Sequence, residues 1–404
     1  MVFRARRLTA AVTDLLQCGA EEAGEVEELT SGCGGGGFVA PKEAGVVPSA
    51  RRLSAGAASV LALLASGLGP AAPLRAAQNP PVAAAARSAS TPSDHARELA
   101  IGVGSPPLTG TLTLPAGKGP FPAVVLVSGS GPNDEDETVG PDKPFLDIAL
   151  GLASRGIASV RYDKRALDYP KSINPRTFTP YDEYVPDALA AIRLLQHEPL
   201  VSPKRIFVLG HSQGGTMAPL IAARAPGLAG VILLAASTEH IGEALLRQVR
   251  YLATLPGEIG ANAAAELPQV AAIAAEISNV ATLEKDSPAT VLFGGVGPAY
   301  YIYDLRYNPV ATARAISQPL LVLQGGRDYQ VTLKNDFDVW KSGLRGRKSV
   351  VFEQFPLADH LFIDGTGPPS PADYQKPSHV DPRVIAAIAS WMTRGPGSGG
   401  LSSH

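Results

Sequence analysis

The sequence predicts an α/β fold in which a doubly wound, mostly parallel, eight-stranded sheet carries helices on both faces. Between residues 98 and 394, short runs of consecutive apolar residues alternate with helical patterns. Such runs are typical of strands that are buried on both faces. The alternation has one long break, residues 238–316, which is rich in Ala, Glu and Leu. We expect this interval to be a helical cap inserted over the carboxyl edge of the sheet, because an insertion of this length is usually functional.

Each expected element follows from local composition and period. Strands are predicted at residues 98–103, 110–114, 123–127, 157–162, 205–209, 231–235, 320–323 and 349–355. The first two are expected to form an antiparallel hairpin. Helices are predicted at residues 145–154, 183–196, 214–224, 333–344 and 381–394. The last helix starts with Asp381-Pro382 and is followed by Gly395, which are preferred residues at helix ends.

The N-terminal quarter is expected to lie outside the catalytic domain. Residues 1–77 are predicted to be a disordered leader, in which residues 51–77 resemble a secretory signal: Arg51-Arg52, an apolar run of about 16 residues and small residues near Ala77. The run is shorter than the ~20 residues of a membrane span, so no stable membrane anchor is expected. Residues 78–97 read as a linker and residues 395–404 as a flexible tail.

Two locations of the protein are compatible with this leader. We expect export, periplasmic or secreted, after cleavage near Ala77; the alternative is a cytoplasmic protein, if the segment is not a functional signal. A signal should begin a chain, so the true start is expected at Val46 or Val47.

Composition excludes several classes of partner and cofactor. Lys and Arg total 35 against 37 Asp and Glu, a formal net charge of -2, whereas a nucleic-acid partner calls for a basic excess. The two cysteines, Cys18 and Cys33, are too few for a disulfide framework or a Cys-rich zinc site. We therefore expect no metal and no cofactor. The oligomeric state is left open.

A five-residue motif predicts the nucleophile. Gly210-His211-Ser212-Gln213-Gly214 follows a predicted buried strand and precedes a predicted helix, which is the context of a nucleophile elbow. The glycines lack the Cβ atoms that would clash on a turn sharp enough to expose the Ser212 hydroxyl. The alternative is an ordinary Gly-rich turn in which Ser212 only caps the helix.

A serine nucleophile needs a base and an orienting acid. In folds with a nucleophile elbow, these residues follow along the chain in the order serine, acid, histidine. His360 follows the last predicted strand by a short loop and is the expected base, with His379 as the alternative. Asp328 follows the strand at 320–323 and is the expected acid, with Glu239 as the alternative. The acid would fix the histidine tautomer and stabilise the imidazolium.

Stabilising an oxyanion requires two backbone N–H groups, which we assign to Gln213 and Ser130. Ser130 lies in a Gly-rich loop that continues into the acidic run Asp134–Glu137. We expect that run to be a solvated rim; a metal site there is a weaker alternative, because no spaced histidine accompanies it. The basic segment Arg161–Arg165 is expected to be a structural ion-pair cluster.

The substrate contacts are expected on the cap, where aromatic residues cluster. Tyr300, Tyr301 and Tyr303 are candidates for a pocket wall that favours apolar acyl or aryl esters; packing within the cap is the alternative role. An exopeptidase would need acids to hold an amine, and Glu239 with Glu243 is the candidate pair.

Taken together and in order, these motifs resemble the α/β-hydrolase superfamily, and within it bacterial carboxylesterases near the acylaminoacyl-peptidase-like branch. The matching stretches lie within residues 98–394: Ser128-Gly-Ser-Gly-Pro-Asn-Asp, Arg161-Tyr-Asp-Lys-Arg165, the elbow, Leu323-Gln-Gly-Gly-Arg-Asp-Tyr-Gln-Val331 and Asp359-His-Leu-Phe362. The resemblance implies a Ser212–His360–Asp328 triad and ester hydrolysis through an acyl-enzyme. Many relatives carry His-Gly where this chain has Ser128-Gly129, which keeps the backbone donor and removes a side-chain support.

The predicted activity is hydrolysis of small-molecule carboxylic esters with short- to medium-chain acyl groups. Two alternatives remain open: an aminopeptidase, acylaminoacyl-peptidase or amidase that uses the same triad, and a non-catalytic binding protein of the same fold. Ser212, Asp328 and His360 argue against the second alternative, since a binding module has no need of all three.

Overall fold

The computed structural model describes residues 96–102, 106–286 and 290–394. The predicted leader 1–77 with its signal-like segment, residues 78–95 of the predicted linker and the predicted tail 395–404 lie outside the described residues. The first strand begins at Ala96. The folded domain therefore includes the last residues of the stretch that was predicted to be a linker.

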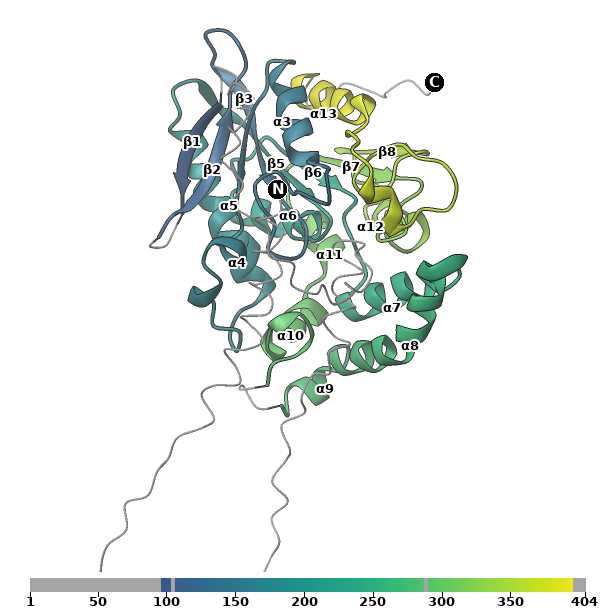
Figure 1. The fold of residues 1–404 in the computed structure, drawn as a ribbon. Coiled ribbons are helices and arrows are strands. Elements are labelled where there is room, and N and C mark those ends of the chain that lie inside the picture. Colours follow the sequence, from purple (N-terminus) through teal and green to yellow (C-terminus); the bar gives the residue numbers. More distant parts are fainter. Residues whose placement is uncertain (1–95, 103–105, 287–289, 395–404) are drawn as a thin grey trace, which may run out of the picture.

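All eight predicted strands are present and form one sheet (Figure 1). They are β1 Ala96–Ile101, β2 Leu108–Thr113, β3 Phe121–Val127, β4 Ala158–Tyr162, β5 Val201–His211, β6 Gly230–Leu234, β7 Leu320–Gly325 and β8 Val350–Phe355. Their order in the sheet is β1-β2-β4-β3-β5-β6-β7-β8. The pairs β1–β2 and β2–β4 are antiparallel and all others are parallel, so the predicted hairpin and the mostly parallel sheet are confirmed.

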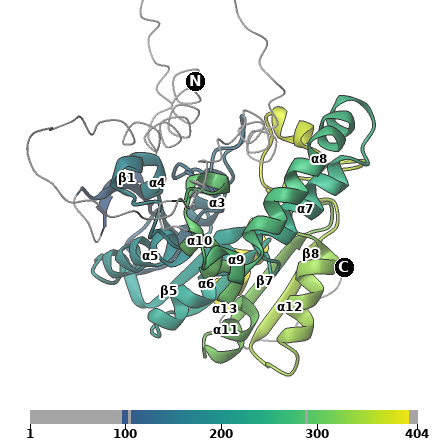
Figure 2. The same ribbon diagram turned by 90° about the horizontal axis from the view of Figure 1, so that it is seen from below.

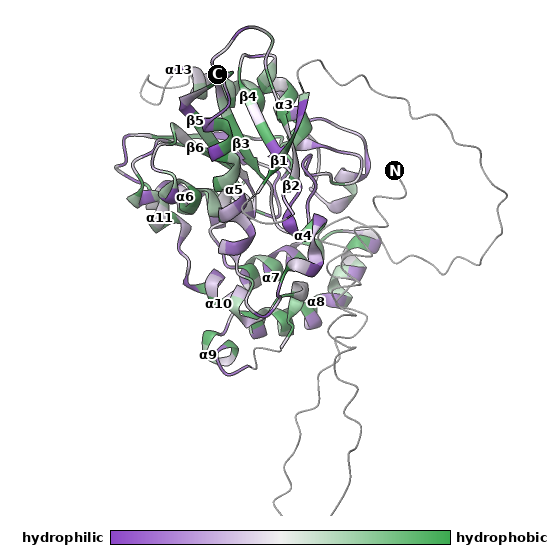
Figure 3. Ribbon diagram, turned by 90° about the vertical axis from the view of Figure 1, so that its left-hand side faces the viewer, coloured by the Kyte–Doolittle hydropathy of each residue, from purple (hydrophilic) through white to green (hydrophobic). Residues whose placement is uncertain are grey.

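Helices cover both faces of the sheet, as a doubly wound fold requires. One face packs on α3 (Pro144–Ala153) and α13 (Pro382–Arg394). The other packs on α5 (Pro180–Gln196), α6 (Gln213–Arg224), α11 (Pro309–Ala315) and α12 (Asp338–Gly343), and the short α4 (Arg165–Asp168) follows β4. Alternate residues of each strand enter the two cores: in β3, Val124 and Leu126 pack with α3, while Val125 and Val127 pack with α5. Figure 3 shows β3 in the green of hydrophobic residues.

The cap consists of α7 (Ile241–Leu252), α8 (Gly257–Ile277), α9 (Val280–Leu283) and α10 (Pro298–Arg306), which lie together beside the sheet (Figures 1 and 2). Its apolar interior includes Leu245, Val249 and Tyr301. No described helix, in the cap or elsewhere, is long and apolar enough to cross a membrane.

The cap is shorter than the predicted interval 238–316, because α11 belongs to the body of the domain. Ala313 of α11 is 0% exposed and lies in the same core as β5 and α6. A second difference concerns the helix predicted at residues 333–344, which starts as a π-helical turn, Leu333–Phe337, before α12.

Candidate active site

Ser212 occupies the sharp turn between β5 and α6. Its backbone has φ 52° and ψ -123°, a conformation that is strained for a residue with a side chain. A Cβ atom at Gly210 would collide with the carbonyl oxygen of Gly214, and one at Gly214 would collide with the carbonyl oxygen of Val127. The two glycines therefore allow the elbow to pack against β3, as the sequence motif indicates.

Ser212, His360 and Asp328 are joined by hydrogen bonds, although they lie far apart in the sequence. His360 Nε2 is 3.1 Å from Ser212 Oγ, and His360 Nδ1 is 2.7 Å from Asp328 Oδ2. A carboxylate can only accept, so Nδ1 carries the proton and Nε2 is left to accept from the serine hydroxyl. The arrangement can remove a proton from Ser212 when its oxygen attacks an electrophile.

The Asp328 carboxylate is held rigidly at the end of β7. Its Oδ1 accepts from the backbone N–H groups of Gln330 and Val331 at 2.8 and 2.9 Å, and its Oδ2 accepts from Gln324 at 3.1 Å. Gly325, at the end of β7, lets the loop that contains His360 pack closely against this strand, because a Cβ atom at Gly325 would overlap the backbone of that loop.

The alternative residues occupy other places. Glu239 accepts from Arg247 at 2.6 Å and from Asn335 at 3.0 Å, so its carboxylate is engaged away from His360. His379 is exposed and lies 3.0 Å from Asp147. Glu239, one of the two acids considered as an amine grip, forms an ion pair with Arg247.

The loop after β3 lies directly beside the nucleophile. A Cβ atom built on Gly129 would be 3.0 Å from Ser212 Cβ, and the Gly129 N–H itself donates to Glu137 Oε1 at 2.5 Å. Ser130 is the next residue and is exposed, so its N–H stays the candidate donor from this loop. Gln213 is the first residue of α6, and its N–H therefore has no acceptor within the helix.

The acidic run Asp134–Glu137 is not the solvated rim predicted from the sequence. Asp136 is 8% exposed and binds Arg161 at 2.9 Å, and Glu137 is 3% exposed. Asp134 accepts a hydrogen bond from the Thr138 N–H at 2.9 Å, and Glu135 accepts from Thr111 at 3.0 Å. Glu135, Asp136 and Glu137 have partners from distant parts of the chain, which the local sequence does not reveal.

Glu137 forms a second histidine–carboxylate pair with the elbow residue His211. Glu137 Oε1 lies 2.9 Å from His211 Nδ1, and His211 Nε2 lies 2.8 Å from the carbonyl oxygen of His360. Burial acts to lower the pKa of His211, but the Glu137 carboxylate and the hydrogen bonds raise it above its ordinary value. The pair connects the loop of Gly129 to the loop of His360.

The segment Arg161–Arg165 forms ion pairs, as expected, and one of its members reaches the site. Arg161 pairs with Asp136 and Arg165 with Asp187. Lys164 is 4% exposed and donates to the Gly129 carbonyl at 2.8 Å. The sequence pattern had given no reason to connect Lys164 with the oxyanion loop.

A closed ring of hydrogen bonds surrounds the side chain of Gln213. Lys164 donates to Glu183 and, at 3.0 Å, to the Tyr184 oxygen. The Tyr184 oxygen is 3.0 Å from Gln213 Oε1, and Gln213 Nε2 is 3.2 Å from the Tyr300 oxygen. Tyr300 closes the ring by donating to Glu183 at 2.6 Å. Burial and the Glu183 carboxylate raise the pKa values of Tyr184 and Tyr300, so both hydroxyls keep their protons. Burial lowers the pKa of Lys164, and Glu183 opposes that shift.

The three predicted pocket tyrosines are packed within the protein. Tyr300 is buried in the ring, and its aromatic face stacks on Phe178 with a centroid distance of 6.1 Å. Tyr301 is 2% exposed and donates to the carbonyl oxygen of Phe293. Tyr303 stacks on Tyr307. Packing, the alternative role considered for this cluster, describes their contacts.

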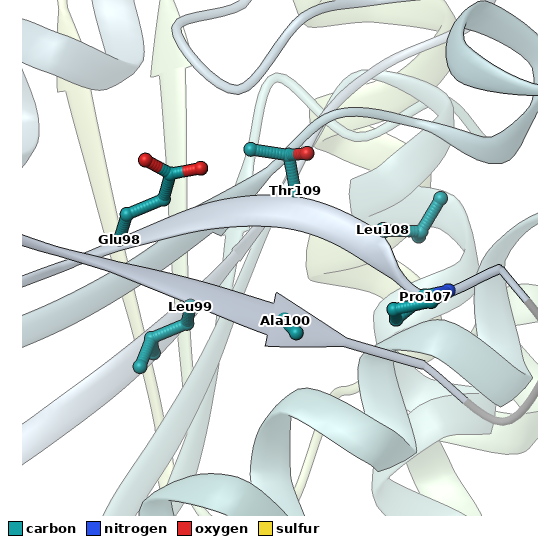
Figure 4. A pocket seen from close by; sticks show the side chains of 6 residues that line it. All are labelled: Glu98, Leu99, Ala100, Pro107, Leu108 and Thr109. Carbon is teal, nitrogen blue, oxygen red and sulfur yellow. The ribbon is translucent and has the colours of Figure 1, made fainter.

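Two hollows lie in the described surface outside the triad. One, of about 290 Å³, is lined by Glu98, Leu99 and neighbours on the hairpin β1–β2 (Figure 4), four strands away from β5. The other, of about 520 Å³, includes Phe178 and Asp182 beside the start of α5. Phe178 stacks on Tyr300, so the second hollow adjoins the hydrogen-bonded ring.

A sheet of this order, with a serine on a strained elbow after β5 and an acid and a histidine after β7 and β8, has the arrangement of the α/β-hydrolase fold. A family model described as serine aminopeptidase, S33, matches residues 143–342. Esterase EstD from Thermotoga maritima is 41% identical over 288 residues, which are 71% of this chain and 66% of EstD. The chain thus spans just under two thirds of that relative's length.

Two of the solved structures to which the chain is similar share little sequence with it. Proline iminopeptidase from Mycobacterium smegmatis is 18% identical, with a TM-score of 0.49, and covers 74% of this chain and 98% of its own. Est1E from Butyrivibrio proteoclasticus is 16% identical, with a TM-score of 0.46, and covers 74% and 98%.

Proposed function

We propose that this enzyme hydrolyses carboxylic esters, with Ser212 as nucleophile, His360 as general base and acid, and Asp328 as the orienting acid. The observation that supports the proposal most directly is the unbroken hydrogen-bonded series from Ser212 Oγ to Asp328 Oδ2, with contacts of 3.1 and 2.7 Å. The likeness to an esterase at 41% identity supports the same bond class.

The proposed reaction has two halves. The Ser212 oxygen attacks the ester carbonyl carbon while His360 takes the hydroxyl proton, and the resulting oxyanion faces the N–H groups of Gln213 and Ser130. Collapse expels the alcohol, which receives the proton from His360. Water then attacks the acyl-enzyme by the same route and releases the carboxylic acid.

The engaged acids favour a neutral ester over a peptide with a free amino terminus. An aminopeptidase must hold an ammonium group, and the carboxylates of Glu239 and Glu183 on segments near the site already pair with Arg247 and Lys164. Each of these carboxylates is already neutralised by a neighbouring cation, which weakens its attraction for the ammonium group of a substrate.

The acyl group is proposed to be apolar and of modest length. Leu361, directly after the base, packs in the same apolar cluster as Tyr329 and the cap residues. Burial of a short acyl chain against apolar side chains contributes about 0.8 kcal/mol per CH₂. We expect acetate to roughly hexanoate esters to be the best substrates.

A panel of p-nitrophenyl esters, assayed beside aminoacyl p-nitroanilides, tests the proposal. We expect the esters to be cleaved faster, and faster cleavage of the anilides would reverse the assignment to an aminopeptidase or amidase. Ser212→Ala should lower kcat by ~10⁴–10⁶-fold. Ester cleavage that survives in that variant would place the nucleophile elsewhere.

We also propose that the protein is exported, on the basis of the signal-like segment at residues 51–77. Expression of the full chain followed by N-terminal sequencing of the mature protein tests this. A mature protein that starts near Gln78 supports export, and a protein that retains residues 51–77 in the cytoplasmic fraction contradicts it.

A further inference from the structure

We propose that Tyr300 of the cap is a positioning residue for the oxyanion hole, because its hydroxyl closes the hydrogen-bonded ring that holds Gln213. This inference rests on the proposed esterase function, since it concerns how the two oxyanion donors are held. It assigns the cap a role in catalysis in addition to covering the site.

The Glu183 carboxylate sets the direction of the hydrogen bonds made by Tyr300 and Gln213. The Glu183 carboxylate accepts, so Tyr300 must donate its single proton to Glu183 Oε2. The Tyr300 oxygen can then only accept from Gln213, which places the amide nitrogen Nε2 on that side. The amide oxygen of Gln213 consequently faces Tyr184 and accepts from its hydroxyl at 3.0 Å.

Lys164 completes the ring with all three of its N–H donors in use. They go to Glu183, to the Tyr184 oxygen and to the carbonyl oxygen of Gly129. The Tyr184 hydroxyl lies 3.0 Å from Gln213 Oε1 and 3.1 Å from the Gly129 carbonyl oxygen, so it contacts both segments that carry the predicted oxyanion donors. Each side-chain nitrogen and oxygen atom in the ring therefore has at least one hydrogen-bond partner, which favours a rigid buried network.

The ring holds both predicted oxyanion donors. Gln213 supplies one donor through its backbone, and the ring fixes its side chain at both ends of the amide. The Gly129 carbonyl, one residue before Ser130, accepts from Lys164 at 2.8 Å. The ring thus connects the start of α6 to the loop after β3, the two segments whose N–H groups must converge on one oxygen atom.

Tyr300 is the ring member that comes from the cap. Lys164 precedes α4, Glu183 and Tyr184 belong to α5, and Gln213 begins α6. Tyr300 lies on α10, where Phe178 stacks on its ring. Seating of α10 on the body is therefore required to close the ring.

Removing the Tyr300 hydroxyl leaves Gln213 Nε2 and Glu183 Oε2 without their partner in a buried site. Groups left unsatisfied in this way reorient to find other partners. A donor displaced by about 1 Å can lower catalysis by up to ~10²-fold. Tyr300→Phe makes this change while keeping the aromatic ring that packs on Phe178.

The first experiment compares Tyr300→Phe with Tyr251→Phe. Tyr251, on α7, also donates from the cap to the body, to the Pro369 carbonyl at 2.8 Å, but outside the ring. We expect kcat of Tyr300→Phe to fall ~10–100-fold with KM changed less than about threefold, and Tyr251→Phe to stay within about twofold of the parent. Equal kcat for Tyr300→Phe and the parent would overturn the proposal.

Binding of an alkyl trifluoromethyl ketone separates positioning from a loss of folded protein. Ser212 adds to this ketone, its proton passes to His360, and the hemiketal oxyanion occupies the oxyanion hole. We expect the inhibition constant to rise in Tyr300→Phe by about the factor lost in kcat/KM, measured on enzyme that active-site titration shows to be folded. An unchanged inhibition constant beside a reduced kcat would reject the oxyanion hole as the point of action.

A double-mutant cycle tests whether Tyr300 acts through Gln213. In Gln213→Ala the backbone donor remains and the ring is already open, so adding Tyr300→Phe should cost less than about twofold further. Losses of kcat that multiply in the double variant would contradict the proposal that Tyr300 acts through Gln213. An active Ser212→Ala enzyme would instead refute the underlying esterase assignment, so the two failures can be told apart.

Discussion

The site contains two histidine–carboxylate pairs of the same chemistry, and they face different third partners. Asp328 orients His360, and Glu137 orients His211; the two imidazole rings are 4.7 Å apart and tilted by 46°. His360 Nε2 meets the Ser212 hydroxyl, which can give up a proton, whereas His211 Nε2 meets a backbone carbonyl, which can only accept. The third partner therefore suits His360 to the proposed role of general base, whereas it suits His211 to holding two loops together.

Replacing each histidine by glutamine should give the largest contrast between the pairs. His360→Gln removes the base, so kcat for a p-nitrophenyl ester should fall by ~10⁴–10⁶-fold. His211→Gln retains a donor for the His360 carbonyl and should cost no more than about a hundredfold. Equal losses in the two variants would mean that His211 also takes part in proton transfer.

The acids can be compared by the same isosteric change. Asp328→Asn should lower kcat at neutral pH by ~10⁴-fold, because the amide favours the wrong tautomer of His360. Glu137→Gln should lower it by only about tenfold, since it loosens the loop of Gly129 without touching the base. The ratio of the two kcat values under identical conditions is the measurement, and a ratio near one contradicts the division of roles.

The charge on His211 should appear in the pH dependence of stability. The folded-state pKa of His211 is raised, so its stabilising contribution is fully present below its unfolded pKa of about 6.5 and is lost as the pH rises through the folded value. Glu137→Gln should therefore lower the free energy of unfolding most at pH 5.5, by about 1–3 kcal/mol, and least at pH 9. Chemical denaturation of the two proteins at both pH values checks this, and a deficit that grows with pH would refute it.

Replacing Asp359, adjacent to His360, should have the smallest effect. Its effect on stability should be opposite in sign to that of Glu137→Gln. Burial raises the pKa of Asp359 to about 7, with Asp328 and Asp373 adding to the shift and the N–H groups of Leu361 and Ile363 opposing it. A raised carboxyl pKa destabilises the fold as the pH rises from about 4 to 7. Asp359→Asn keeps the acceptor and should be no more stable than the parent at pH 4 but more stable at pH 8. A melting temperature that is lower at both pH values would contradict this shift.

Local patterns were enough to predict the strands and the positions of Ser212, Asp328 and His360. Each depends on a short segment: an apolar run, a strained turn with small residues, or a polar residue at the end of a buried strand. The fold brings these three residues together, because the carboxyl ends of parallel strands meet at one edge of the sheet.

The remaining features depend on pairing between distant segments. Nothing near Glu137 or Lys164 in the sequence indicates that His211 or the Gly129 carbonyl will lie against them. The composition of the short Ala-rich helix α11 does not indicate whether it packs in the cap or on the sheet. The predicted cap therefore extended too far and included α11. Burial of an acid is decided by its partner, and the partner is a property of the fold.

Labelling with an alkyl fluorophosphonate tests the central claim most directly. The Ser212 oxygen should displace fluoride and form a bond to phosphorus, with its proton taken by His360. Mass spectrometry should then find one adduct per chain, on the peptide that contains Ser212, and at least about a hundredfold slower labelling in His360→Gln. An adduct on another residue, or labelling of Ser212 at an undiminished rate without His360, would contradict the account.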